Sequence, residues 1–329
     1  MYNSHFRTAR ILCLALALLC ILSSCSVPHA ASEPSPSKSV AESPTVEMEL
    51  TITPLAQSPA VSSLIMPEAS GTVVYENEFA KIDASHTDLG YIMIRHTAYS
   101  DKRMKVIITG PSLTAYTYNL PSNDEFAVFP LSDSSGSYSA KIYENAYDDK
   151  YALILDAKLD VKLKDEFAPF LTPNQFVNYN ENTEAVLVAR QLTAGQTDPI
   201  KKIGIVFKYV VNTISYDYEL ARTVQSGYLP DLDEVLIQKK GICFDYASLM
   251  TAMLRSLNIP TKLVVGYTGS IYHAWISTYT DESGWVDGVI FFDGAKWKLM
   301  DPTFVSAAEK DDMVDYMEND ANYQAKYLY

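Results

Sequence analysis

One short stretch constrains this chain more than any other: Gly-Ile-Cys-Phe-Asp-Tyr-Ala at residues 241–247. Apolar residues then recur at helical spacing until Asn-Ile-Pro at 258–260 ends the pattern. These apolar positions are Ala247, Met250, Leu254 and Leu257. The pattern predicts a buried helix with Cys243 in its first turn, preceded by an unusual backbone turn at Gly241. Asp245 is expected to stabilise the start of this helix.

Cys243 is placed to act as a nucleophile. The first N–H groups of a helix are unpaired and its dipole is positive there, so this position favours a thiolate. A nucleophile needs a base, and the base needs a group that orients it. His273 follows thirty residues later in a strand-like stretch, and Asp301 twenty-eight residues after that at the end of another. After residue 96, Cys243 is the only cysteine and His273 the only histidine, so this Cys-His-Asp assignment has no local competitor.

Four separated motifs in this part of the chain resemble the transglutaminase-like (papain-like thiol) superfamily. They are Gly-x-Cys-x-Asp-Tyr-Ala at 241–247, Asn-Ile-Pro before a strand that ends in Val-Val-Gly-Tyr at 264–267, His-Ala-Trp at 273–275 and Asp-Pro-Thr at 301–303. The resemblance covers roughly Asp198 to Phe304. It implies an α+β cysteine fold in which Cys243 is the nucleophile, His273 the base and Asp301 the orienting group. It does not fix the reaction, because members include protein crosslinkers, peptidases, amidases and inactive scaffolds.

Acyl transfer also needs hydrogen-bond donors for the carbonyl oxygen that becomes negative. The N–H group of Cys243 is one candidate. Tyr216 matches the place where the superfamily often puts an aromatic donor, and it is the second candidate. The alternatives are that Tyr216 only fills a helix junction, or that Tyr218 or Gln238 takes this role.

The N-terminus predicts export and lipid attachment. Residues 1–24 contain two arginines, no acidic residue and a twelve-residue apolar run, a signal-peptide pattern too short to span a bilayer. The run ends in Leu-Ser-Ser-Cys, which resembles a bacterial lipobox and implies cleavage before Cys25 with a lipid on that cysteine. An ordinary signal peptide is the alternative. The expected location is the extracytoplasmic face of the cell membrane, held by this anchor.

Cysteine content and charge narrow the chemistry. After such processing Cys243 is the only free thiol, which rules out a structural disulfide, although burial as a small apolar residue remains an alternative role. The net charge of −14 becomes −16 when the two arginines of residues 1–24 are removed. A chain this acidic repels nucleic acid, and a basic or amine-bearing protein or peptide partner is expected instead. No cofactor or metal motif is present, and His86 and His96 are interpreted as scattered surface residues.

Composition divides the rest of the chain. Residues 25–70 are rich in Ser, Pro and Ala and are expected to form a disordered tether. Residues 71–167 show short alternating runs, including apolar residues at every odd position from 151 to 163, which predicts an antiparallel β-sandwich. Its tyrosines are interpreted as packing residues, with a carbohydrate or protein platform as the alternative.

Residues 168–329 are expected to form the transglutaminase-like domain. Thr183 and Asp198-Pro199 are N-terminal helix signals, and 231–238 predicts a short helix that leads into the one carrying Cys243. The whole is therefore expected to be an α+β protein that catalyses thiol-mediated acyl transfer or hydrolysis at amide bonds. The alternatives are a peptidase or amidase acting on cell-wall or surface peptides, and a non-enzymatic scaffold that keeps the fold.

Overall fold

The computed structural model describes residues 64–97, 100–287, 290–292, 297–299 and 323–329. All of them belong to one unit, Ala56–Tyr329. The expected signal peptide, the lipid-attachment residue Cys25, most of the expected tether and Asp301 lie outside the described residues. No helix in the described ranges is long and apolar enough to cross a membrane. The fold is α+β, as predicted.

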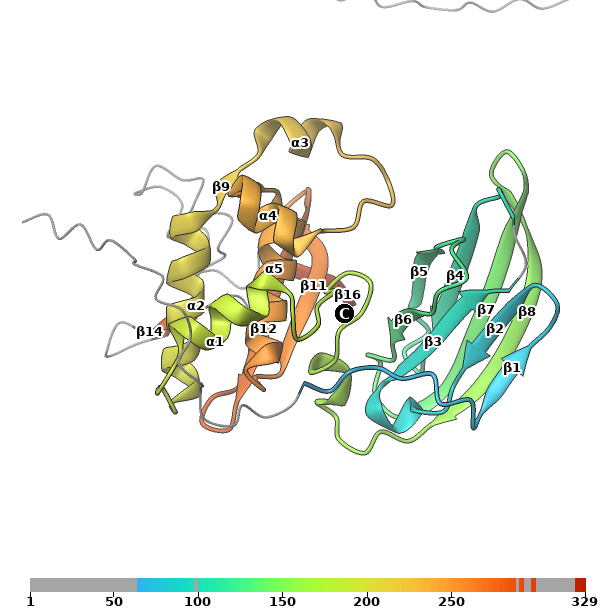
Figure 1. Ribbon diagram of the computed structural model, residues 1–329, viewed down its shortest axis with the longest axis horizontal. Helices are drawn as coiled ribbons and strands as arrows, with labels where there is room; N and C mark the ends of the chain where they lie inside the picture. The colour runs from blue at the N-terminus through green and yellow to red at the C-terminus, as the bar shows by residue number, and fades with distance from the viewer. Residues whose placement is uncertain (1–63, 98–99, 288–289, 293–296, 300–322) are drawn as a thin grey trace, which may run out of the picture. The chain divides into compact units, whose positions relative to one another are not determined.

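The first half of the described chain forms two four-stranded antiparallel sheets, as the alternating pattern predicted (Figure 1). One sheet has the order β1-β2-β3-β6 and the other β5-β4-β7-β8. The strands are β1 (Val74–Glu76), β2 (Ala80–Asp83), β3 (Tyr91–His96), β4 (Met104–Thr109), β5 (Ala115–Leu120), β6 (Ala127–Pro130), β7 (Gly136–Tyr147) and β8 (Lys150–Val161). A short 3-10 turn, Thr87–Leu89, joins β2 to β3. Among the described strands, β5 is an edge strand that pairs with β4 alone.

Only part of the predicted alternation in β8 serves the core. Ala157, Leu159 and Val161 are buried, whereas Leu153 is 50% exposed. The pairing of β7 with β8 shifts register beside Ile142 and Tyr143, and the hairpin extends past the neighbouring strands (Figure 1). Apolar residues in the extended part therefore have no opposite sheet to cover them.

The surface interpretation of His96 was wrong. His96 ends β3, is only 2% exposed and pairs with Ala80 of β2. His86 precedes the 3-10 turn without a side-chain capping bond, and its ring stacks on Tyr91 with centroids 5.8 Å apart. Among the described residues no group of His, Cys, Asp and Glu is arranged to hold a metal ion.

The second half contains five α-helices within the described residues. They are α1 (Glu184–Leu192), α2 (Pro199–Thr213), α3 (Tyr218–Thr223), α4 (Leu232–Gln238) and α5 (Cys243–Ser256), after a 3-10 turn at Ala168–Phe170. The predicted starts of α2 and α4 are confirmed: Asp198 accepts hydrogen bonds from the N–H groups of Ile200 and Lys201, and Asp231 from that of Glu234. Thr183 precedes α1, but its side chain does not cap the helix. The N–H of Glu184 is held by Asp233 instead, at 2.9 Å.

A sheet of order β13-β12-β11-β16 lies against α5, which α1, α2 and α4 contact from other sides (Figure 1). Its strands are β11 (Thr261–Thr268), β12 (Ile271–Thr280), β13 (Gly284–Asp287) and β16 (Tyr323–Leu328). Two small pairs complete the described strands: parallel β9 (Ser215–Tyr216) with β10 (Lys240–Gly241), and antiparallel β14 (Ile290–Phe292) with β15 (Trp297–Leu299). The α5 helix is thus buried between helices and sheet.

Tyrosines of β5 join the two halves. Tyr118 packs on Phe176 and Tyr329, with centroid distances of 5.5 and 5.9 Å, and the Tyr116 hydroxyl accepts the N–H of Leu328 at 3.4 Å. These two tyrosines therefore pack as interpreted, and their partners come from the second half as well as from neighbouring strands.

Two of the last residues of the expected tether are hydrogen-bonded to the folded part of the chain. The N–H of Leu64 donates to Glu181 at 3.2 Å and that of Glu68 to the Tyr91 hydroxyl at 3.1 Å.

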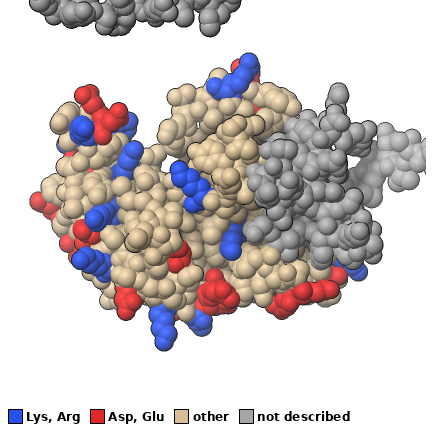
Figure 2. All heavy atoms as spheres, turned by 180° about the vertical axis from the view of Figure 1, so that it is seen from behind, with Lys and Arg blue, Asp and Glu red and all other residues tan. Residues whose placement is uncertain are grey.

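Acidic and basic side chains are interspersed over the face in Figure 2 and do not form one single-sign patch there.

Candidate functional site

Cys243 is the first residue of α5, as the sequence predicted. The chain reaches it through Lys239, which adopts a left-handed conformation (φ 53°), and through the short β10 strand. Gly241 does not have the unusual backbone turn expected for it. A Cβ at Gly241 would lie 2.7 Å from the Cβ of Asp245, so glycine is needed there for close approach. The left-handed turn lies two residues earlier than predicted.

Asp245 stabilises the start of α5, as expected. One carboxylate oxygen accepts the N–H of Ile242 at 2.7 Å, and the other accepts the hydroxyl of Tyr228 at 2.7 Å. The side chain is fully buried. Burial raises the pKa of the Asp245 carboxyl, and the two hydrogen bonds offset part of this effect. Tyr228, which the sequence did not single out, therefore links the loop before α4 to the turn that carries Cys243.

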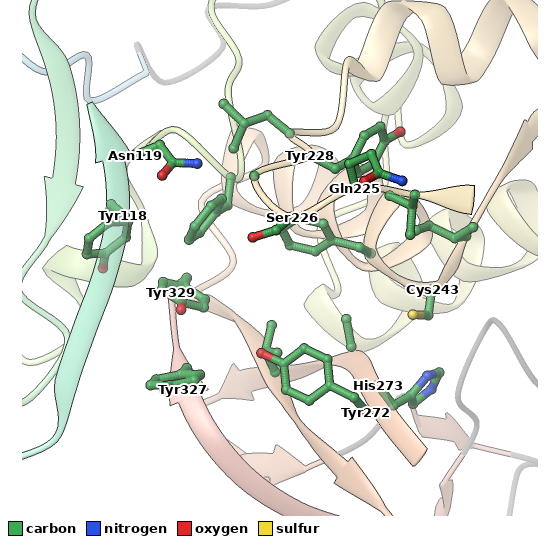
Figure 3. Close-up of a pocket in the computed structure, with 18 of the residues that line it drawn as sticks. Tyr118, Asn119, Gln225, Ser226, Tyr228, Cys243, Tyr272, His273, Tyr327 and Tyr329 are labelled. Atoms are coloured by element: carbon green, nitrogen blue, oxygen red, sulfur yellow. The ribbon is translucent and has the colours of Figure 1, made fainter. Parts of the chain in front are cut away.

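His273 lies on β12, opposite Gly266 of β11, and is 6% exposed. Its ring stacks on Trp275 with centroids 6.3 Å apart. Cys243 and His273 line one pocket of about 660 Å³. Figure 3 shows the Cys243 sulfur and the His273 ring at the same end of this pocket. A thiol at a helix start and an imidazole on the facing strand are the parts that nucleophilic catalysis requires.

Tyr216 lies beside the approach to Cys243, because β9 pairs with β10 and places Tyr216 opposite Gly241. It also lines the pocket, and its ring contacts that of Tyr218 at 4.9 Å. The substitutes are placed less well. Tyr218 is 62% exposed, Gln238 donates to Glu234, and neither is among the lining residues described.

Several aromatic residues from distant parts of the chain also line the pocket. Tyr272 of β12 and the C-terminal residues Tyr327 and Tyr329 line it, and β5 of the sandwich contributes further residues. Burial raises the pKa of Tyr272, and the neighbouring Tyr327 hydroxyl adds to this effect. No Asp or Glu is found among the lining residues that the structure describes. Sequence reasoning missed these tyrosines because their spacing along the chain carries no local pattern.

Arg255, near the other end of α5, is almost fully buried. Its guanidinium donates to the main-chain oxygens of Thr261 at 2.8 Å, Thr172 at 2.6 Å and Tyr329 at 2.6 Å. Burial lowers its pKa to about 10, so it remains charged at neutral pH. This side chain fixes the helix relative to the C-terminal strand that lines the pocket.

Comparison with known proteins locates the family resemblance. Residues 187–288 match the transglutaminase-like superfamily. This range includes Cys243 and His273 but ends before Asp301. The matched range thus contains three of the four sequence motifs, and Asp-Pro-Thr at 301–303 lies beyond it.

Two curated relatives share parts of the chain. The uncharacterized protein YebA of Bacillus subtilis (strain 168) is 30% identical over 144 residues, which are 38% of this chain and 19% of that protein. The UPF0252 protein MJ1282 of Methanocaldococcus jannaschii is 35% identical over 91 residues, 24% of this chain and 26% of that protein. The chain thus spans less than a third of the length of these relatives, and neither name states an activity.

Solved structures show more distant likeness. A structure described as a candidate cysteine protease from Cytophaga hutchinsonii is 14% identical, covers 78% of this chain and 74% of its own, and has a TM-score of 0.36. Red sea bream transglutaminase is 13% identical, with coverage of 67% and 48% and a TM-score of 0.31. Likeness at this level assigns no residue roles.

Proposed function

We propose that this protein catalyses thiol-mediated acyl transfer or hydrolysis at amide bonds of proteins or peptides. The observation that supports it best is that Cys243, first residue of a buried helix, and His273, on the facing sheet, line the same pocket. The match of residues 187–288 to the transglutaminase-like superfamily agrees with this chemistry.

The proposed reaction has two halves. The Cys243 thiolate attacks the carbonyl carbon of the amide, the C–N bond breaks, and the nitrogen takes a proton from protonated His273 and leaves as ammonia or an amine. Water or another primary amine then gives a proton to His273 and attacks the thioester. The C–S bond breaks and the thiolate returns. Water as second nucleophile gives hydrolysis, and an amine gives crosslinking.

The remaining roles complete the proposal. Asp301 accepts a hydrogen bond from His273 and orients its ring. The N–H of Cys243 and the hydroxyl of Tyr216 stabilise the negative oxygen, and the pairing of Tyr216 opposite Gly241 supports this choice over Tyr218 and Gln238.

We also propose that the mature protein is anchored at the outer face of the cell membrane through a lipid on Cys25. The support is the signal-peptide pattern of residues 1–24 and the Leu-Ser-Ser-Cys ending. Cys25→Ala is expected to release the protein from the membrane fraction, and unchanged retention would contradict the anchor.

Product analysis tests the activity. The full chain is incubated with a glutamine-containing peptide, with and without dansylcadaverine, and ammonia release, peptide cleavage and dansyl incorporation are measured. Ammonia release without incorporation indicates an amidase, incorporation indicates a transferase, and cleavage indicates a peptidase. The absence of all three would favour the non-enzymatic scaffold, and products that persist in Cys243→Ala would contradict the role of Cys243 as nucleophile.

A further inference from the structure

We propose that the open edge of strand β5 binds the acyl-donor substrate as an extended polypeptide, which it pairs with as an added strand. This inference rests on the proposed function and names the substrate class: a flexible or unfolded segment of a protein rather than a small amide. Four observations support it: the position of β5 beside the pocket, the direction of its backbone groups, the loop that joins β5 to the Cys243 turn, and the charge of the pocket.

Strand β5 borders the pocket with its edge. Thr117, Tyr118 and Asn119 all line the pocket. Along a strand, neighbouring side chains point to opposite faces, and here Tyr118 is buried while Thr117 and Asn119 are exposed. A cavity that touches side chains of both faces must lie along the edge of the strand. Among the strands that the structure describes, none pairs with that edge, because β5 is the last strand of its sheet.

The backbone groups of β5 point into this space. The carbonyl of Asn119 accepts a hydrogen bond from the side chain of Gln175 at 3.3 Å, so it points away from β4. In an antiparallel pair, the N–H and C=O of one residue point to the same side, and so do those of every second residue. The N–H of Asn119 and both groups of Thr117 therefore point to the open edge. A peptide laid along this edge meets both groups of Thr117 and the N–H of Asn119 at the spacing of a β-ladder, while the carbonyl of Asn119 already accepts from Gln175.

A loop connects this edge to the candidate catalytic turn. Gly227 (φ 92°) lies so close to the Asn119 side chain that a Cβ would collide with its amide nitrogen. The next residue, Tyr228, donates to Asp245, which in turn holds the N–H of Ile242, next to Cys243. A chain bound at β5 thus contacts a loop hydrogen-bonded to the start of α5. In Figure 3, Asn119 and Cys243 lie at opposite ends of the pocket, so a chain that reaches the thiol from β5 follows the length of the pocket.

The charge of the pocket does not favour a basic chain. Apart from His273 and Cys243, the charged side chain among the described lining residues is Lys105, which pairs with Asn119 across the strands and lies 4.9 Å over the ring of Tyr151. The protein is strongly acidic, yet these lining residues include no carboxylate. This end of the pocket therefore does not select a basic segment. Its tyrosines accept apolar and aromatic side chains.

The test measures binding to full-length Cys243→Ala, by fluorescence anisotropy, of a fluorescein-labelled neutral peptide of about twelve residues with one central glutamine. Thr117→Pro removes an N–H that points outward and keeps the ladder to β4, as proline on an edge strand does. We expect it to weaken binding about tenfold or more. Ala115→Pro is the matched control. The backbone groups of Ala115 point to the same edge as those of Thr117, but Ala115 is outside the described pocket lining. Peptide binding to this variant should be unchanged. Thermal melts check that both variants fold.

A second arm uses the unaltered strand. Peptides N-methylated at successive positions should lose affinity at every second residue, because only alternate N–H groups face β5. Binding that Thr117→Pro leaves intact, or a methylation profile without alternation, overturns the proposal. Tighter binding by a peptide of residues 46–55 would assign the edge to the chain's own N-terminal segment and also overturn it. If the labelled peptide binds as predicted but the wild-type protein releases no ammonia, cleavage product or conjugate from it, the proposed function fails while the β5 site stands.

Discussion

The two ends of α5 are built in opposite ways. At its start, Cys243 is half-buried beside the pocket, and the turn before it is held by one buried carboxylate and the tyrosine of a loop. Near its end, Arg255 is buried and bonded to three main-chain oxygens from three separate segments. The start of α5 faces the pocket and is held by few contacts, whereas its end is bonded to three other segments of the fold.

This difference separates stability from chemistry within one helix. Changes near Arg255 should alter the free energy of unfolding more than any property of the thiol. Changes near Asp245 should alter the geometry of the Cys243 turn at a smaller cost in stability. The following substitutions test this separation, beginning with the largest expected effect.

Arg255→Met should destabilise the protein by about 3–5 kcal/mol, because three buried carbonyl groups lose their donor at once. The measurement is the free energy of unfolding by denaturant. Lys262→Met, on the neighbouring β11 strand, removes a cation that lies over the Trp285 ring and should cost about 1 kcal/mol. Equal losses in the two variants would contradict the anchoring role of Arg255.

Gly241→Ala should cost about 1–3 kcal/mol and lower activity, because its Cβ would lie 2.7 Å from that of Asp245 and push the Cys243 turn out of place. Gly204→Ala, inside α2 with no atom within 4 Å of the added carbon, should instead stabilise by about 0.5–1 kcal/mol. The measurements are the thermal unfolding and the turnover of both variants. A Gly241→Ala variant with wild-type activity and stability would contradict the need for close packing at this position.

Asp245→Asn tests the buried carboxyl through pH. Since the folded-state pKa is raised above its ordinary value of 3.8, this group favours folding below that pH, and the benefit is lost as pH rises through the folded-state pKa. Relative to wild type, Asp245→Asn should therefore gain stability as pH rises from about 3 to about 7, because the variant has no carboxyl to lose its proton. Melting curves of both proteins across this pH range measure the difference in stability. A variant that loses stability relative to wild type as pH rises would contradict the burial argument.

Local pattern predicted much of this architecture. The helix of Cys243, the strand of His273 and the caps at Asp198 and Asp231 follow from periodicity and short-range hydrogen bonding. Arg255 shows what such patterns omit. A charged residue inside a buried helical pattern was a signal that it must be paired, but its partners at Thr172 and Tyr329 are 83 and 74 residues away.

The pocket could not be predicted from the sequence either. Its tyrosines are brought together by the pairing of β11 with β16 and by contact of β5 with the C-terminal residues, and no spacing rule encodes either. The expected turn at Gly241 failed for a related reason, since glycine serves close approach as well as left-handed geometry. His96 looked like a surface residue because burial at a strand end depends on what packs over it.

The central claim is that Cys243 and His273 act as one nucleophilic pair. Its most direct measurement is the rate of iodoacetamide alkylation at Cys243, followed by peptide mapping near neutral pH in wild type and in His273→Ala, with folding of both checked by thermal melts. The account predicts that Cys243 reacts about tenfold or more faster in wild type than in the variant, because the imidazole assists ionisation of the thiol. Equal rates in the two folded proteins would contradict it.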